Sequence, residues 1–166
     1  MKFFYTTILL VIIPLSITAQ SNKIQAAIKT IEDLSFDEDT YGVSKVEVDY
    51  DEVTKKITIT RSFFLSEDNN GTYKSTFYVE DLNKSTFEAE TSSMLDGYSV
   101  FIRIKTHGKN VEFWTKDMDK SKFFKPIVKT EFIDVINLSN NKILPQSFAS
   151  KYLDSVKILL GLDNGN

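Results

Sequence analysis

The single histidine is the first residue to consider, because imidazole is the side chain that most often acts as a general base near neutral pH. His107 directly precedes Gly108, and this pair predicts a turn. The sequence has no strand-turn-helix motif that would present a nucleophilic serine to His107, and it has no cysteine. We therefore expect His107 to be a solvent-exposed turn residue, and we assign no catalytic residue.

Carboxylates offer the remaining route to catalysis. A glycosidase-like mechanism needs two carboxyl groups about 5 to 10 Å apart. Glu88 and Glu90 meet that spacing if they share one face of a strand. Almost any acidic pair on a solvated strand does the same. A small carboxylate-dependent hydrolase is therefore the alternative function, and a non-enzymatic role is favoured.

Sites for cofactors and metals are not indicated by the residue types. The six glycines form neither a P-loop nor a dinucleotide fingerprint, and no histidine pair or cysteine is present to indicate a zinc site. Residues 32–52 hold nine acidic residues and one lysine, and Asp37, Glu38 and Asp39 offer oxygen ligands for Ca²⁺. Their spacing matches no calcium loop, so we interpret this region as a solvated acidic surface and expect no cofactor.

A basic segment raises the question of a polyanionic ligand. Residues 116–129 hold five lysines and two aspartates, interleaved with Phe123 and Phe124. The whole chain, however, carries a formal net charge of −3, and strong nucleic-acid binders are usually basic. We therefore expect no nucleic-acid partner, and we interpret the two phenylalanines as a core anchor for a loop.

An aromatic and cationic surface is the strongest candidate for ligand binding. Residues 98–115 are expected to form a hairpin through a two-residue turn at 108–109. On the face away from the core, this register places Arg103 opposite Trp114, with Phe101 beside them. A cation-π pair next to a second ring suits stacking on a sugar or a protein partner. Phe101, Arg103 and Trp114 are therefore the candidate ligand-binding residues.

These side chains need a scaffold, and two amphipathic helices are predicted at its ends. Apolar residues recur at helical spacing over residues 24–34 and again over residues 148–160. The second helix is expected to begin near Pro145 and to end at Gly161.

Between the helices the apolar period changes to two, which predicts strands. The clearest alternation lies at residues 45–51. After the next strand we expect a three-residue loop with Gly71 in the left-handed conformation, which places Phe63 opposite Phe77. Residues 127–138 fit either a strand or a helix.

The predicted order is a helix, five or six mainly antiparallel strands and a second helix, which is an α+β arrangement. A curved, barrel-like sheet closed by the last helix, as in pleckstrin-homology-like domains, is a variant of this fold. No repeat or linker interrupts residues 20–166, so we expect a single globular domain.

Residues 1–19 have the features of a secretory signal peptide. Lys2 supplies the positive charge, residues 8–13 form the apolar core, and Ala19 is the small residue before the expected cleavage bond. Cleavage after Ser21 is an alternative. The apolar core is too short to span a bilayer, and the absence of cysteine excludes acylation at an N-terminal cysteine. The sequence predicts a secreted or periplasmic protein whose mature part has no transmembrane span.

Four stretches resemble small exported proteins of flavobacteria and related Bacteroidota. They are Ala19-Gln20, residues 57–61, residues 77–83 and the final helix at residues 148–162. The resemblance spans most of the chain, implies export and the same order of elements, and includes no catalytic or ligand-binding motif. We therefore expect an exported, non-enzymatic domain that binds an envelope component or a partner protein. An inhibitor or accessory protein is a further alternative.

Overall fold

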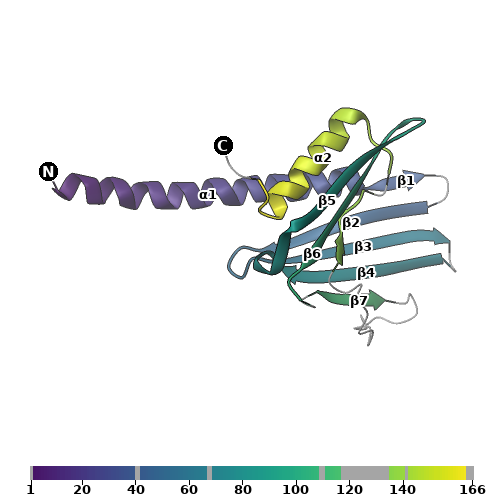
Figure 1. Cartoon of the computed structure of the whole chain (residues 1–166), viewed down its shortest axis with the longest axis horizontal. Helices are drawn as coiled ribbons and strands as arrows, with labels where there is room; N and C mark the ends of the chain where they lie inside the picture. Colours follow the sequence, from purple (N-terminus) through teal and green to yellow (C-terminus); the bar gives the residue numbers. More distant parts are fainter. Residues whose placement is uncertain are drawn as a thin grey trace.

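A computed structural model of the protein describes residues 2–39, 42–66, 69–108, 111–116, 135–140 and 142–163. Figure 1 shows its elements along the chain. They are α1 (Lys2–Ser35), β1 (Asp37–Asp39), β2 (Gly42–Asp51), β3 (Lys56–Ser66), β4 (Asn69–Tyr78), the 3-10 helix η1 (Val79–Asp81), β5 (Leu82–Met94), β6 (Gly97–Thr106), β7 (Glu112–Lys116), β8 (Val135–Asn137) and α2 (Gln146–Leu159).

The strands form two antiparallel sheets, which confirms the predicted α+β class. The first sheet has the order β1-β2-β3-β4-β7, and the second sheet has the order β5-β6-β8. In the described part of the chain neither sheet closes on itself, so the barrel-like variant is not formed. The described residues form eight strands, more than the five or six expected. Residues 135–137 are a strand, whereas residues 127–134 lie outside the described ranges.

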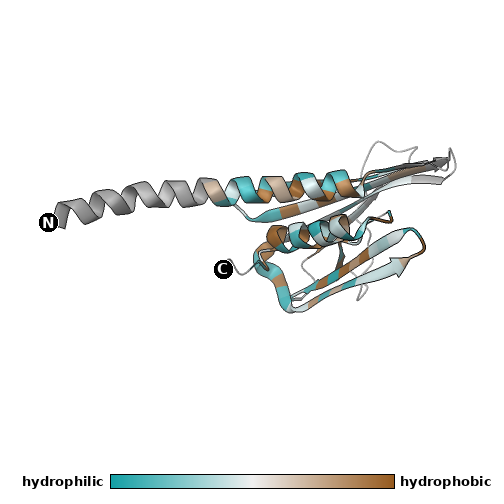
Figure 2. Ribbon diagram, turned by 90° about the horizontal axis from the view of Figure 1, so that it is seen from above, coloured by the Kyte–Doolittle hydropathy of each residue, from teal (hydrophilic) through white to brown (hydrophobic). Residues whose placement is uncertain are grey.

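The two helices join the sheets into one core. Helix α1 contacts β2 and α2, and α2 in turn contacts β6 of the second sheet. Figure 2 shows α2 lying between the β5–β6 hairpin on one side and α1 with the first sheet on the other. The most deeply buried side chains therefore come from all four parts: Ile31, Ile57, Phe77, Val100, Ile102, Ile104, Tyr152, Val156 and Leu159.

Both predicted helical faces are confirmed, except that Phe148 at the start of α2 is 46% exposed. Within residues 19–35 of α1, the buried apolar residues are Ile24, Ala27, Ile28 and Ile31. Among the described residues no helix is both long enough and apolar enough to cross a membrane. Helix α2 begins directly after Pro145, and Gly161 beyond its end adopts a left-handed φ of +63° that lets the chain leave the helix.

The strand alternation predicted at residues 45–51 is also confirmed. Val46 and Val48 are buried, Tyr50 is half-buried, and the acidic side chains between them are exposed. The turn that follows is held by Asp51, whose Oδ1 accepts hydrogen bonds from the backbone N–H groups of Val53 at 2.9 Å and Thr54 at 3.2 Å. These hydrogen bonds, that of Thr54 first, lower the pKa of the Asp51 carboxyl.

The hairpin of β3 and β4 forms in another register than the predicted one. Phe63 lies opposite Gly71, not opposite Phe77, and Phe77 lies opposite Ile57. The strands turn between residues 66 and 69, so Gly71 belongs to β4 and not to the turn. A Cβ on Gly71 would lie 3.1 Å from Cζ of the Phe63 ring. Gly71 therefore leaves room for the Phe63 ring. The prediction that Gly71 is a left-handed turn residue is wrong.

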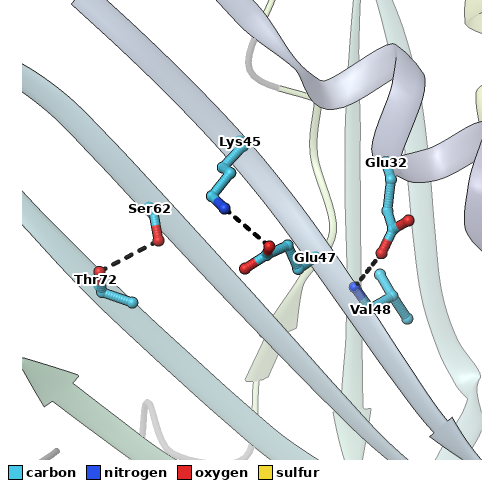
Figure 3. A network of polar contacts seen from close by, with 6 residues as sticks. All are labelled: Glu32, Lys45, Glu47, Val48, Ser62 and Thr72. Carbon is cyan, nitrogen blue, oxygen red and sulfur yellow. Dashed lines mark hydrogen bonds and ion pairs between the residues drawn. The ribbon is translucent and has the colours of Figure 1, made fainter.

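Helix α1 also covers an edge of the first sheet. Strand β1 pairs only with the beginning of β2, at residues 42–44, which leaves the rest of this edge to other groups. Figure 3 shows that the backbone N–H of Val48 donates instead to the Glu32 carboxylate, at 2.8 Å. The hydroxyl of Ser21 makes a second link by donating to Glu52. The β2 edge is thus protected against pairing with other chains.

Polar pairs stabilise the face of the first sheet that points away from the core. Lys45 and Glu47 form an ion pair of 2.8 Å along β2, and the hydroxyls of Ser62 and Thr72 are 3.2 Å apart across β3 and β4 (Figure 3). The ion pair is exposed and contributes only a few tenths of a kcal/mol, whereas the hydroxyl pair is part-buried. The acidic side chains of β2 on this face are exposed, as the sequence predicts for the acidic region.

Strand β6 is the centre of the second sheet, and its backbone is bonded on both sides. Tyr98 and Leu144 exchange two hydrogen bonds of 2.8 Å, and the N–H of Leu138 donates to the carbonyl of Ile102 at 3.0 Å. The even-numbered residues of β6 therefore point their backbone groups toward residues 135–144. Because these directions alternate along a strand, the odd-numbered residues point toward β5.

Gly97 opens β6 and allows the close approach of residues 143–144. Its φ is +152°, and a Cβ there would lie 2.7 Å from the carbonyl oxygen of Leu144. We expect Gly97→Ala to reduce the free energy of unfolding by about 3 kcal/mol or more, because it adds a backbone clash to the conformational strain. Urea denaturation followed by circular dichroism measures this loss.

Gly108→Ala is the matched control, because Gly108 also has a positive φ, of +79°, but a Cβ added there would meet no atom within 4 Å. We expect this substitution to cost about 1 kcal/mol, from the left-handed conformation alone. Equal losses for the two variants would contradict the clash with Leu144.

Candidate functional site

The structure separates the three residues that the sequence grouped as a binding surface. Phe101 and Arg103 lie on β6 in the second sheet, where Cζ of Arg103 is 4.3 Å from the centroid of the Phe101 ring. Trp114 lies on β7 in the first sheet, opposite Lys74 of β4. The predicted hairpin of residues 98–115 is wrong, and so is the pairing of Arg103 with Trp114.

The reason for this error is that β6 has no edge left for β7. One edge of β6 is occupied by β5, and the other by residues 135–144. The chain after β6 therefore passes from the second sheet to the first, where β7 pairs with residues 72–76 of β4. A turn of suitable composition at 107–110 supports a local hairpin only when the neighbouring edge is open.

Phe101 and Arg103 remain together on the outer face of the second sheet. Across the strands, Glu88 lies opposite Arg103 and Glu90 lies opposite Phe101. Glu88, Glu90 and Arg103 are exposed, and Phe101 is half-buried. A carboxyl group that acts as a general acid is usually held in a desolvated site. The exposed position of both glutamates therefore does not favour the paired-carboxylate hydrolase.

His107 lies at the end of β6 and is exposed, as predicted. Its backbone N–H donates to the carbonyl of Asp81 at 2.7 Å and so fixes the start of the connection to β7. The acidic residues of β1 pair with residues 42–44 and not with residues 47–51. Within the described ranges, no group of three or more His, Asp or Glu side chains is placed to hold a metal ion.

A row of three stacked aromatic rings crosses the first sheet, and the sequence pattern did not predict it. The Phe63 and Tyr73 rings have centroids 5.7 Å apart and planes within 18° of parallel. The Tyr73 and Phe113 rings are 6.0 Å apart with an interplanar angle of 24°. We call these three residues the aromatic row. It runs from β3 across β4 to β7, through diagonal neighbours that long side chains can bridge.

The aromatic row lies on the same face as the core but beyond the most deeply buried residues. In the strand register Phe63, Tyr73 and Phe113 alternate in phase with Ile57, Ile59 and Phe77. The core residues are almost fully buried, whereas Tyr73 is 41% exposed and the other two rings are half-buried. The row is therefore the accessible continuation of the core surface.

Arg61 lies opposite Tyr73, the middle ring of the aromatic row, in the β3–β4 register. Its Nη2 donates to the backbone carbonyls of Asn137 at 2.9 Å and Ser139 at 3.1 Å. Burial lowers the pKa of Arg61, and the neighbouring Tyr152 opposes that shift. A guanidinium nevertheless stays protonated in proteins, so Arg61 is a permanent charge that links β3 to the segment after β8.

Tyr152 of α2 continues this polar junction into the helices. Its hydroxyl donates to the carbonyl of Leu138 at 2.9 Å and accepts from the Ser35 hydroxyl at 3.2 Å. Burial raises the pKa of Tyr152 above the ordinary value of 10.0, while the Ser35 hydrogen bond and the Arg61 charge partly oppose that rise. The hydrogen bonds of Arg61 and Tyr152 thus join β3, residues 137–139 and both helices.

The sequence held one signal for the aromatic row. Gly71 follows Phe63 in the next strand, and a glycine opposite an aromatic residue allows the ring to lie over the backbone. The contribution of Phe113 had no such signal, because it depends on the pairing of β7 with β4.

We expect Tyr152→Phe to lower the free energy of unfolding at neutral pH by about 1 to 2 kcal/mol. The substitution removes the hydrogen bond to Leu138 and the acceptor for Ser35 in a buried site. Denaturant unfolding measures the loss. Tyr50→Phe, at a half-buried tyrosine on β2, is the control and should cost less.

The difference between wild type and Tyr152→Phe should also depend on pH. The folded-state pKa of Tyr152 is raised, so the unfolded chain loses this proton first and stability falls as the pH rises above about 10. The Tyr152→Phe variant has no phenol at this position, so its free energy of unfolding does not decrease for this reason. The stability gap should therefore narrow above pH 10, and a gap that widens would contradict the buried neutral phenol.

Comparisons with known proteins add no assignment to this geometry. No protein-family model matches the sequence, no curated protein matches it, and no solved structure matches the fold.

Proposed function

We propose that the protein is an exported, non-enzymatic domain that binds a partner protein of the cell envelope through the aromatic row. The observation that supports this proposal is the accessible stack of Phe63, Tyr73 and Phe113 at the end of the core face. Aromatic side chains that stay accessible beside a rigid sheet are typical of protein interfaces, where they supply large contact area at low entropic cost.

We favour a protein partner over a sugar because the row offers three adjacent rings from three strands as one apolar surface. Aromatic side chains of this kind are enriched in protein interfaces.

Two other functions are less well supported. A carboxylate-dependent hydrolase would use Glu88 and Glu90, and both are exposed on the outer face of the second sheet. An inhibitor or accessory protein would use the same kind of surface as the proposed binding domain, so the identity of the partner decides between them. The second surface, Phe101 with Arg103, is supported by its cation-π contact and is tested in parallel.

We expect Tyr73→Ala to weaken capture of the partner at least tenfold, because Tyr73 is the central ring of the row and a tyrosine hot spot contributes about 2 kcal/mol or more. The measurement is an affinity pull-down from the envelope fraction with the purified chain as bait, followed by titration of the recovered partner against each variant by calorimetry.

Tyr78→Ala is the matched control. Tyr78 is on the same strand and is 39% exposed, close to the 41% of Tyr73, but it lies on the opposite face of the sheet. We expect this variant to bind like wild type. If Phe101→Ala weakens binding and Tyr73→Ala does not, the binding surface is that of the second sheet and the aromatic row is the wrong site.

Export is tested by the mature N-terminus. We expect the intact mass of the protein recovered outside the cytoplasm to correspond to a chain that begins at Gln20, or at Asn22 if cleavage follows Ser21. A chain that retains Met1 would contradict the export proposal.

A further inference from the structure

Strand β5 forms an open edge of the second sheet. It is 13 residues long, and within the described part of the chain it pairs only with β6. The comparable edge at β2 is covered by β1 and by the Glu32 carboxylate. Among the described residues no similar cover lies beside Ala89, Thr91 and Ser93, all of which are exposed.

The direction of the free backbone groups follows from the bonds of β6. Its odd-numbered residues point toward β5, and Phe101 lies opposite Glu90 while Arg103 lies opposite Glu88. Glu88, Glu90 and the even-numbered residues that follow therefore direct their backbone groups to β6. Ala89, Thr91 and Ser93 must direct their N–H and C=O groups outward, to the open edge.

We propose that two copies of the chain pair through this edge, antiparallel, with the two-fold axis at Thr91. Thr91 then exchanges two backbone hydrogen bonds with Thr91 of the second copy. Ala89 of each copy exchanges two more with Ser93 of the other copy. The two second sheets become one continuous sheet. All outward-pointing groups of residues 89–93 are satisfied in this register.

Charge selects this register over its neighbours. Paired residues must both point their backbone groups to the shared edge, so the axis passes through a residue. An axis at residue 89 or 90 places Glu90 opposite Glu88 or opposite itself, and an axis at 92 or 93 places a glutamate opposite Asp96. With the axis at Thr91, Glu88 lies opposite Met94 and Glu90 lies opposite Ser92, so no two carboxylates face each other.

The same register accounts for an exposed apolar tip. Met94 is 50% exposed and Leu95 is fully exposed in the turn between β5 and β6. With the axis at Thr91, this tip lies beside Phe87 of the second copy, which is itself only half-buried. Pairing thus covers apolar surface at both ends of the shared strand. The proposal does not depend on the aromatic row, which is on the other sheet.

Sedimentation equilibrium of the purified processed chain over a range of concentrations is the test, with Thr91→Pro as the first variant. Proline removes the outward N–H of Thr91, which takes no part in the β5–β6 ladder, so an edge position tolerates it. We expect the dissociation constant of the dimer to rise about tenfold or more, because the central pair loses both hydrogen bonds. Thr91→Val keeps the N–H and the branched shape, and should stay within about threefold of wild type.

Two charge variants test the register. Thr91→Lys places two lysines directly opposite each other and should weaken the dimer even if the proline variant fails to fold. Ser92→Lys places each lysine opposite Glu90 of the second copy and should tighten the dimer, whereas with an axis at residue 92 it would oppose two lysines and weaken it. A wild-type chain that stays monomeric at about 1 mM overturns the proposal, as does a dimer unaffected by both substitutions of Thr91.

Discussion

Buried backbone carbonyl groups must be hydrogen-bonded, and the carbonyl of the buried residue Leu138 imposes this requirement where both helices and both sheets meet. Arg61 from the first sheet donates to the carbonyls of residues 137 and 139, and Tyr152 from α2 donates to the carbonyl between them. Ser35 at the end of α1 donates in turn to Tyr152. One short irregular segment therefore fixes both helices and both sheets relative to one another.

The elements of this protein were predictable where the evidence is local. Helical spacing located the buried faces of α1 and α2, and alternation located the buried face of β2, because each depends on a few neighbouring residues. Strand pairing was not predictable in the same way. The alternation of Val100, Ile102 and Ile104 shows which face of β6 is buried, but it carries no information on whether β7 or residues 135–144 occupy its edge.

The candidate sites also differ in whether they depend on local sequence or on strand pairing. Phe101 and Arg103 are two residues apart on one strand, so their contact could be predicted from sequence alone. The aromatic row joins residues from three strands. Predicting it requires both the register of β3 with β4 and the pairing of β4 with β7. The predicted register of β3 with β4 was wrong because Gly71 was interpreted as a turn residue, although it makes room for the Phe63 ring.

The contact between Ser35 and Tyr152 spans 117 residues, because the two helices that pack together come from opposite ends of the chain. Contacts of such long separation form late and slowly, since a large loop must close first. Until α2 has been synthesised, the apolar faces of α1 and β6 have no complete core to enter. The complete core, with the Ser35–Tyr152 contact at its junction, can therefore form only once the C-terminal helix is present.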